Sequence, residues 1–189
     1  TQNITVNVTN VNDVAPVISS NAEFIVAENQ TAIGTVTATD AEEDTLTYSV
    51  SGTELSISSS GVLTFKAAPD YETKTSYTAV ISVNDGVNEV TQDITVNVTN
   101  VNDNSPIISA ESSYSILENQ TSVATISASD ADGDSLQFAV SGYGNLEVRI
   151  DQDGNLFLAN SPDYEADENF TFATVVVSDG SFSTEKDIE

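Results

Sequence analysis

Carboxylate side chains recur at matching points of an internal repeat in this chain of 189 residues. The recurring positions are Glu28 and Glu118, Asp40 and Asp130, the motifs Asp70-Tyr-Glu72 and Asp163-Tyr-Glu165, and the dipeptides Asp85-Gly86 and Asp179-Gly180. The offset between the copies is 90 residues for the first two pairs, 93 for the third and 94 for the last. Calcium takes about six to eight oxygen ligands, and gathered carboxylates need cations to relieve their repulsion. The spacing therefore predicts divalent-metal binding at the ends of the repeats.

The overall charge of the chain is strongly acidic. Thirty Asp and Glu residues stand against four Lys and Arg residues, so the formal net charge is −26. A chain of this kind can build no cationic surface, which excludes nucleic acid and anionic lipid as partners. Two interpretations of the acidity stay open: a solvated surface that keeps a secreted protein soluble, or clusters that hold divalent cations. The regular recurrence of the acids favours clusters.

Histidine and cysteine are both absent. The usual nucleophile–base pairs, disulfides and the usual zinc ligands are therefore unavailable. Paired carboxylates can hydrolyse glycosides, but here their spacing repeats with the domain, so we predict no enzyme. No apolar run of about 18 residues is present, so we expect no direct membrane insertion. Because no secretory signal peptide is present either, we expect the segment to come from a longer secreted or cell-surface chain.

One segment of the repeat is a nearly identical copy. Thr1–Asp13 returns as Thr91–Asp103 with a single change, from Asn3 to Asp93. A period near 90 residues is the length of a whole domain. We therefore expect the last strand and linker of a preceding, absent repeat at 1–13, a first repeat at 14–103, and a second repeat with a truncated last strand at 104–189. The short polar junction between the repeats predicts closely held domains.

Alternating apolar and polar residues give the period of half-buried strands. Ile94, Val96 and Val98 alternate with polar residues, and the copy at the start of the chain has the same pattern. In the first repeat we expect strands near 17–27, 31–38, 45–50, 54–58, 62–65, 76–84 and 88–99. No window shows a convincing helical stripe. The sequence thus predicts an all-β chain of two tandem seven-stranded Greek-key β-sandwiches placed end to end.

Short acidic motifs, taken together and in order, resemble those of a known family. The junction Asn100-Val-Asn-Asp-Asn-Ser-Pro106 resembles the cadherin linker D-x-N-D-N-x-P, with Asn in the first position. Glu28 and Glu118 resemble the acid of the first cadherin strand, and the two Asp-Tyr-Glu motifs resemble its D-x-E motif. Asp130-Ala-Asp132 resembles the D-x-D loop, from which Asp40-Ala-Glu42 departs by carrying Glu. Over essentially its whole length the chain is similar to tandem cadherin repeats of the bacterial kind.

The resemblance implies cadherin-like or Ig-like sandwiches with a complete calcium junction between the two repeats. The first repeat would supply Glu28, Asp70 and Glu72; the linker would supply the side chains of Asn102 and Asp103 and the backbone oxygens of Val101 and Asn104; the second repeat would supply Asp130, Asp132 and Asp179, with Asp134 as a further candidate. About three Ca²⁺ would nearly neutralise the acidic members of this set. Mg²⁺ suits the set less well, because it demands compact octahedral geometry.

The resemblance also implies two half-sites at the chain ends. The N-terminal half-site would contain Asn12, Asp13, Asp40, Glu42, Asp44 and Asp85. The C-terminal half-site would contain Glu118, Asp163 and Glu165. Each half-site lacks its complement, so weak or no binding is expected there. A plain alternative is that the Asp-Gly dipeptides are simply hairpin turns.

Three functional hypotheses follow. The first is a calcium-stiffened extender or adhesion segment of an extracellular bacterial surface protein, whose partners are the neighbouring repeats of its own chain. The second is a calcium-dependent carbohydrate-binding module of a secreted polysaccharide-active or surface protein, although the chain has no Trp for a sugar platform. The third is homophilic adhesion, in which residues 1–13 of one molecule complete the second repeat of the next by head-to-tail strand donation.

Overall fold

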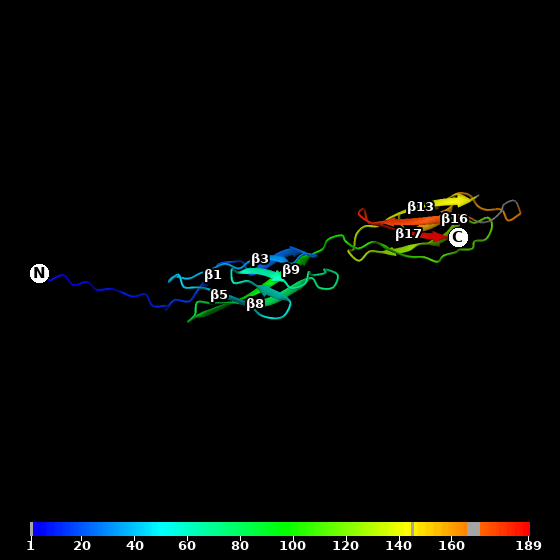
Figure 1. The fold of residues 1–189 in the computed structure, drawn as a ribbon. Helices are drawn as coiled ribbons and strands as arrows, with labels where there is room; N and C mark the ends of the chain where they lie inside the picture. The colour runs from blue at the N-terminus through cyan, green and yellow to red at the C-terminus, as the bar shows by residue number, and fades with distance from the viewer. Residues whose placement is uncertain (1, 145, 166–170) are drawn as a thin grey trace. The chain divides into compact units, whose positions relative to one another are not determined.

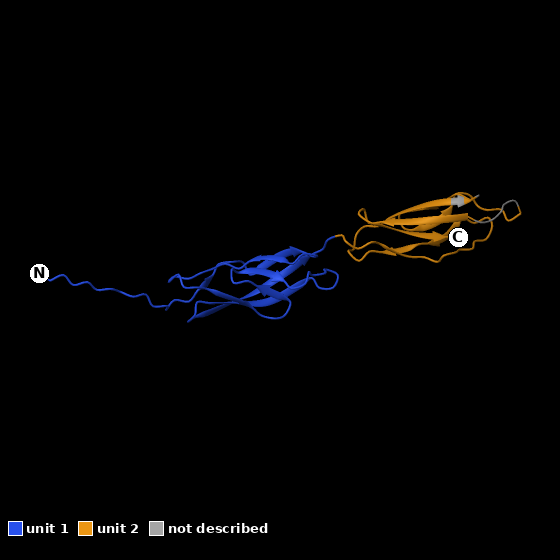
Figure 2. Cartoon of the chain, viewed as in Figure 1, with its two compact units in different colours: residues 1–101 blue, residues 102–189 orange. Residues whose placement is uncertain are grey.

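The computed structural model describes residues 2–144, 146–165 and 171–189. The chain divides into two compact units, of which unit 1 ends at Val101 and unit 2 runs from Asn102 to Glu189 (Figure 2). Every regular element of the described ranges is a β-strand, which confirms the all-β class. Within these ranges there is accordingly no helix with the length and apolarity that a membrane crossing requires.

Unit 1 forms nine strands over residues 2–101 (Figure 1). In chain order they are β1 (Val17–Ile18), β2 (Glu23–Ala27), β3 (Ala32–Thr35), β4 (Ala38–Thr39), β5 (Thr47–Val50), β6 (Leu55–Ile57), β7 (Val62–Phe65), β8 (Ser76–Asn84) and β9 (Glu89–Thr99). One sheet has the order β2-β9-β8-β5, a second has the order β3-β7-β6, and β1 pairs with β4. All pairs are antiparallel except β2 with β9, which run parallel.

Two of the expected strands of unit 1 are each broken in two. The segment expected at 17–27 gives β1, which pairs with β4, and then β2, which pairs with β9. The segment expected at 31–38 is interrupted at Val36, whose N–H donates to the carbonyl of Gly61 at 2.8 Å. A strand that leaves one ladder for another must interrupt its pairing at the change. The prediction of one continuous strand over each of these two segments was therefore wrong.

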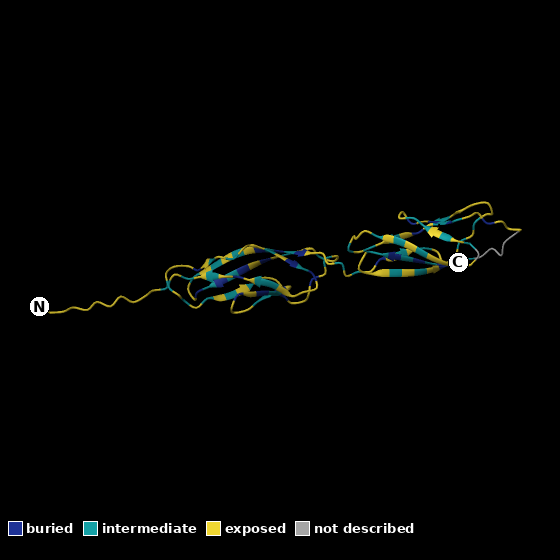
Figure 3. Ribbon diagram, turned by 90° about the horizontal axis from the view of Figure 1, so that it is seen from above, coloured by how far each residue is buried: buried dark blue, intermediate teal, exposed yellow. Residues whose placement is uncertain are grey.

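The core of unit 1 lies between its two larger sheets, where the buried residues gather (Figure 3). Strand β9 contributes Ile94, Val96 and Val98, which are all buried, while the residues between them face outward. This alternation is the reason the segment forms a strand with one apolar face. The same face packs against the buried residues of β8 and β7, which are Ala79, Ile81, Val83, Leu63 and Phe65.

Unit 2 repeats this plan with a shorter last strand. Its strands are β10 (Ile107–Ser109), β11 (Ser122–Thr125), β12 (Ser127–Ser129), β13 (Gln137–Gly144), β14 (Val148–Ile150), β15 (Asn155–Leu158), β16 (Thr171–Ser178) and β17 (Ser183–Ile188). The sheet orders are β13-β16-β17, β11-β15-β14 and β10-β12. Even the irregularity in register between β3 and β7 recurs between β11 and β15.

The difference between the units lies at the last strand. β17 matches only the first six residues of β9, Glu89–Ile94, at the offset of 94. The first hydrogen bond of the parallel pairing is nevertheless present in both units. Glu189 N–H donates to Ser112 O at 2.9 Å in unit 2, and the equivalent Thr95 N–H donates to Ala22 O at 2.8 Å in unit 1. Residues 113–117, which correspond to β2, form no strand.

Two glycines of unit 1 allow a matched test of this packing. Gly61 and Gly52 have φ of +80° and +81°, but a Cβ on Gly61 would lie 2.2 Å from Val36 O, whereas a Cβ on Gly52 would meet nothing within 4 Å. We expect Gly52→Ala to lower the free energy of unfolding by about 1 kcal/mol through backbone strain. Gly61→Ala should lower it by about 3 kcal/mol or more, because a steric clash adds to the strain. Chemical denaturation measures both, and equal losses would contradict the packing described.

Candidate metal centres

An acidic loop follows β4 in unit 1. The Oδ1 atom of Asp40 accepts the backbone N–H groups of Glu42 at 3.0 Å and of Asp44 at 3.1 Å, which folds the loop into a tight turn. Carboxylate oxygens of these three residues lie within 4.8 Å of one another. Glu43 completes the turn with a φ of +62°, at the position where unit 2 has Gly133 with a φ of +79°. This role of Glu43 was not predicted from the sequence.

The turn between β8 and β9 holds the other predicted residues of this end. The Oδ1 atom of buried Asp85 accepts the N–H groups of Val87 at 2.8 Å and of Asn88 at 2.6 Å. The amide of Asn88 donates to Asp85 Oδ2 at 3.2 Å and to Asn12 Oδ1 at 3.1 Å, and Asn12 Nδ2 donates to Asp85 O at 3.2 Å. Asn88 thus ties Asn12 to the turn. Sequence reasoning missed Asn88, although its place after the Asp-Gly turn was the available signal.

Unit 2 has the same acidic loop after β12. The Oδ1 atom of Asp130 accepts the N–H groups of Asp132 at 2.9 Å and of Asp134 at 3.4 Å, and the three carboxylates lie within 4.8 Å of one another. Asp132 also binds the segment that leads into the unit. Its Oδ2 atom accepts the N–H groups of Asp103 at 3.1 Å and of Asn104 at 2.9 Å, and its Oδ1 atom accepts Asn104 Nδ2 at 3.0 Å.

Asp179 occupies the position of Asp85 in unit 2. Its Oδ1 atom accepts the N–H groups of Ser181 at 2.6 Å and of Phe182 at 2.7 Å. Partial burial would raise the pKa of Asp179, but these N–H groups outweigh it and hold the pKa below its ordinary value. The same balance, with Asn88 and Val87 as donors, lowers the pKa of Asp85. Both carboxylates are therefore held in the charged form that binds a cation.

Several oxygens of these loops are buried without a hydrogen-bond donor in the described part of the chain. In unit 1 they are Asp40 Oδ2, Glu42 Oε2 and Asp44 Oδ2, and in unit 2 they are Asn102 Oδ1, Asp130 Oδ2 and Asp179 Oδ2. Buried polar atoms are nearly always satisfied, so each such oxygen calls for an explanation. Asp40, Asp130 and Asp179 share one arrangement: Oδ1 closes a local turn, and Oδ2 is left over.

No protein cation compensates these loops within the described ranges. The ion pairs found there join Lys74 to Glu54 at 2.6 Å and Arg149 to Glu147 at 2.9 Å, and neither pair includes a residue of the acidic loops. The consequence is visible at Glu42, where burial and then the carboxylate of Asp40 raise the pKa, with Asp13 and Asp44 adding to the effect. A divalent cation would relieve this repulsion.

The opposite end of unit 1 is organised by Glu28, which is only 3% exposed. Its Oε2 atom accepts the N–H of Tyr71 at 2.6 Å, and its Oε1 atom accepts the N–H of Val101 at 2.8 Å. A carboxylate oxygen of Glu72 lies within 4.8 Å of one of Glu28. Asp70 closes its own turn, because its two carboxylate oxygens accept the N–H and hydroxyl of Thr73 at 3.1 and 2.9 Å.

The matching end of unit 2 is open. Carboxylate oxygens of Glu118, Asp163 and Glu165 lie within 4.8 Å of one another, but all three residues are exposed. Glu118 accepts the N–H of Tyr164 at 3.4 Å, a longer contact than that of Glu28 with Tyr71. In unit 1 the residues after β9 cover Glu28 and bind its second oxygen. Unit 2 has no such segment over Glu118 within its described residues.

The residues predicted for the junction thus fall into two sets. Unit 1 carries Glu28, Asp70, Glu72 and Val101, and unit 2 carries Asn102, Asp103, Asn104, Asp130, Asp132, Asp134 and Asp179. Within unit 2, carboxylate oxygens of Asp103 and Asp132 lie within 4.8 Å of each other. All the side-chain donors are oxygens, and this donor set suits calcium.

Glu28 and Glu118 allow a prediction about stability. Glu28→Ala would leave two partly buried N–H groups without their charged acceptor, so we expect a loss of about 2 to 4 kcal/mol in the free energy of unfolding of unit 1. Glu118→Ala removes an exposed carboxylate from the same motif and should change the stability of unit 2 by less than about 0.5 kcal/mol. Denaturation in the presence of a chelator measures both. Equal effects would show that Glu28 does not fasten this end of unit 1.

Comparisons with known proteins agree with this architecture. The family model described as the bacterial Ig domain matches residues 12–99 and 102–187. Chitinase A of Pseudoalteromonas piscicida is 30% identical over 88% of this chain and 20% of its own length. Protocadherin-15 of Homo sapiens is 29% identical over 76% of this chain and 8% of its own length. Cadherin EGF LAG seven-pass G-type receptor 1 of Mus musculus is 26% identical over 94% of this chain and 6% of its own length.

The chain therefore spans a fifth or less of the length of these curated relatives. Among solved structures, EC1-2 of human protocadherin-24 superposes with a TM-score of 0.79 at 22% identity, covering 93% of this chain and 97% of the other. EC22-24 of mouse cadherin-23 gives a TM-score of 0.73 at 25% identity, covering 94% of this chain and 64% of the other. These similarities confirm a tandem pair of cadherin-like β-sandwiches.

Proposed function

Since this chain belongs to the bacterial Ig domain family and has the fold of tandem cadherin repeats, we propose that it binds calcium at the acidic ends of its repeats. The single observation that carries the proposal is the set of buried, donorless oxygens in the two acidic loops. The same Oδ2 atom is left over at Asp40 and at Asp130, which are 90 residues apart. A recurring deficit at equivalent positions is what a metal-dependent loop would have without its ion.

The chemistry of the donor set supports calcium over other metals. Carboxylate, amide and carbonyl oxygens are hard ligands, and the chain has no histidine or cysteine for zinc. Calcium accepts irregular sets of six to eight oxygens, whereas Mg²⁺ demands near-ideal octahedral geometry and keeps its waters. Loops with several bidentate-capable carboxylates therefore favour Ca²⁺.

The complete site is proposed at the junction of the two repeats. Val101 N–H binds Glu28 in unit 1, and Asp103 N–H binds Asp132 in unit 2. One residue separates Val101 from Asp103. About 7 Å of extended backbone therefore joins the residue that binds Glu28 to the residue that binds Asp132. About three Ca²⁺ would be held by the two sets of junction residues described above, and they would bridge the repeats. The two end groups would bind more weakly, because each offers half of such a set.

The proposed role is mechanical and extracellular. Without calcium, repulsion between carboxylates would let the junction bend; with calcium, shared ligands would hold it stiff. Extracellular calcium modules bind with Kd values of about 10⁻⁴ to 10⁻³ M, so free calcium outside cells suffices. We therefore propose a calcium-stiffened extender or adhesion segment of a larger secreted or cell-surface protein, with neighbouring repeats as its immediate partners.

Calcium titration of a junction variant tests this function. The unaltered chain should bind about three Ca²⁺ by calorimetry, and a site filled at a hundred times its Kd should add about 2.7 kcal/mol to the free energy of unfolding. Asp103→Ala combined with Asp132→Ala should remove most of the binding and the rise in melting temperature. The control is Glu111→Ala with Glu185→Ala, which removes two exposed acids of unit 2 outside the clusters.

Small-angle scattering gives the mechanical readout. Calcium should narrow the distribution of maximum dimensions of the unaltered chain and of the control variant, but not that of the junction variant. If the junction variant kept the stoichiometry and the scattering response of the control, the junction assignment would be wrong.

A second candidate function is supported by the similarity to chitinase A, which is 30% identical over 88% of this chain. In this alternative, the repeats are a calcium-dependent carbohydrate-binding module of a secreted polysaccharide-active protein. We expect retention on insoluble chitin in calcium, release by chelator, and no retention on insoluble cellulose. A chain that stays in the supernatant under all conditions would exclude this alternative while leaving the calcium junction untouched.

A further inference from the structure

The turn between the last two strands of each unit differs at one side chain. In unit 1 Asn88 is the third residue after Asp85, and at the same place after Asp179 unit 2 has Phe182. The backbone of the two turns is alike, because the N–H of the Asp donates to the carbonyl of this third residue at 3.2 Å in both. In return, the Asp Oδ1 atom accepts the N–H of Asn88 at 2.6 Å and that of Phe182 at 2.7 Å. The two units therefore offer the same frame with an amide side chain in one and an apolar side chain in the other.

In unit 1 the amide of Asn88 satisfies two oxygens at once. Its Nδ2 atom donates to Asp85 Oδ2 at 3.2 Å and to Asn12 Oδ1 at 3.1 Å. A side-chain amide carries two N–H donors, so both hydrogen bonds can form together. Asp85 is only 6% exposed, and its carboxylate oxygens are thus satisfied within the protein.

In unit 2 the same two oxygens have no donor. Asn102 is the counterpart of Asn12 at the offset of 90 residues. Asp179 is the counterpart of Asp85 at the offset of 94. Asn102 Oδ1 and Asp179 Oδ2 are both buried, and no hydrogen-bond donor reaches them in the described part of the chain. The side chain of Phe182 has no polar atom to offer, so the pair of oxygens that one amide satisfies in unit 1 is the pair left over in unit 2.

The surroundings of these two oxygens are negatively charged. Partial burial and the carboxylate of Asp132 both act to raise the pKa of Asp179, although the N–H groups of the turn hold that pKa below its ordinary value. Asp132 is fixed in place, because it accepts the N–H groups of Asp103 and Asn104. Another donor would satisfy the two oxygens, but only a cation would also reduce the repulsion between the carboxylates of Asp132 and Asp179.

We propose that the residue at this place in the turn decides whether a repeat needs a cation there: the amide of Asn88 takes in unit 1 the place that Ca²⁺ takes beside Asp179 and Asn102 in unit 2. The inference rests on the proposed function, because it requires that the acidic ends bind calcium. The two occupants exclude each other. Calcium lies about 2.3 to 2.6 Å from its oxygen ligands. An ion bound to both oxygens would therefore overlap a nitrogen that lies 3.1 and 3.2 Å from their counterparts in unit 1.

The two linkers are consequently held in different ways. Asn12 is fastened to the turn of unit 1 by Asn88 and by its own donation to Asp85 O at 3.2 Å, and neither contact involves an ion. Asn102 Oδ1 has no such amide partner, so calcium is what completes its contact with the turn of unit 2. The turn of unit 1 should therefore be equally ordered with and without calcium, and the turn of unit 2 should gain order when calcium binds.

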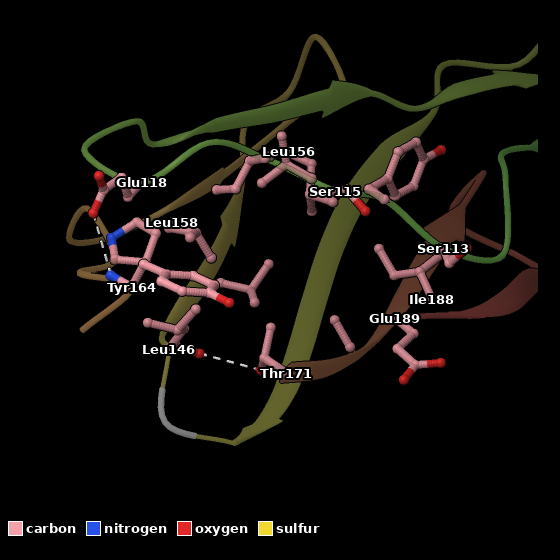
Figure 4. Close-up of a pocket in the computed structure, with 16 residues that line it drawn as sticks. Ser113, Ser115, Glu118, Leu146, Leu156, Leu158, Tyr164, Thr171, Ile188 and Glu189 are labelled. Atoms are coloured by element: carbon pink, nitrogen blue, oxygen red, sulfur yellow. Dashed lines mark hydrogen bonds between the residues drawn. The ribbon is translucent and has the colours of Figure 1, made fainter. Parts of the chain in front are cut away.

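The apolar cavity of unit 2 does not interfere with a test at Phe182. Its volume is about 460 Å³, and Figure 4 shows side chains that surround it, among them Leu156, Leu158 and Ile188. Neither Phe182 nor Phe172 is among its lining residues. Both side chains are partly exposed, Phe182 by 40% and Phe172 by 49%. Phe172 lies near the start of β16, whereas the turn follows the end of that strand, so Phe172→Asn makes the same chemical change away from the turn.

Hydrogen exchange in chelator tests the two turns without calcium. Phe182→Asn should slow the exchange of the Ser181 N–H by about tenfold, because the new amide supplies the missing donor and fixes the acceptor of that N–H. Asn88→Ala should speed the exchange of the Val87 N–H by about tenfold for the opposite reason. The control Phe172→Asn should leave both rates unchanged. If neither variant differed from the control, the amide would not fasten the turn and the inference would fail.

Calorimetry and hydrogen exchange in calcium test the ion. The unaltered chain and Phe172→Asn should bind about three Ca²⁺, whereas Phe182→Asn should bind about one fewer, because its amide occupies the place of an ion. Calcium should slow the exchange of the Val87 N–H in Asn88→Ala but not in the unaltered chain, because removal of the amide leaves a place for the ion.

The outcomes separate this inference from the proposed function. No calcium uptake by any of the chains would overturn the proposed function and the inference with it. Uptake of the same number of ions by Phe182→Asn and by the unaltered chain would leave the proposed function standing and overturn the inference alone, since water would then be what satisfies Asn102 and Asp179.

Discussion

The parallel pairing of β9 with β2 is the interaction on which the rest of unit 1 depends. Strand β9 lies between β2 and β8 and contributes Ile94, Val96 and Val98 to the core. The same strand delivers Val101 to Glu28, so completing the sandwich also buries the acid of the first strand. In unit 2, residues 113–117, the counterpart of β2, form no strand, and Glu118, the counterpart of Glu28, is exposed. Core, sheet and acidic end are therefore completed together.

Repulsion between carboxylates is the second constraint on this molecule. With a net charge of −26 and only four basic residues, the chain cannot neutralise its acidic loops internally. The loops are held instead by their own backbone, since one oxygen of Asp40, Asp130 or Asp179 accepts two N–H groups. This arrangement fixes the carboxylates in place and leaves their other oxygens unused. A rigid set of unused oxygens lowers the ordering cost of binding an ion.

Local patterns made much of this predictable. The alternation of apolar residues identified the β class, and the repeat identified which acids recur. The breaks in the first two expected strands were not predictable, because a change of sheet leaves the alternation intact on both sides of the break. Glu28 and Glu118 sit in the same motif, Glu-Asn-Gln-Thr, yet one is buried and the other exposed. The burial of Glu28 depends on Val101, more than 70 positions away, and has no local signal. Asn88 likewise matters through its contact with Asn12.

The thirteen residues that occur twice show how strand and metal ligands are combined in one segment. Their first part carries the alternating Ile, Val and Val that close a sandwich, and their last part carries the Asn and Asp that lead into the next acidic loop. In unit 1 the first part is buried between two strands, while at the chain start the same residues are exposed. In unit 1 the strand that completes the core is also the strand that brings Val101 to Glu28, so the stability of the unit and the order of its acidic end are coupled.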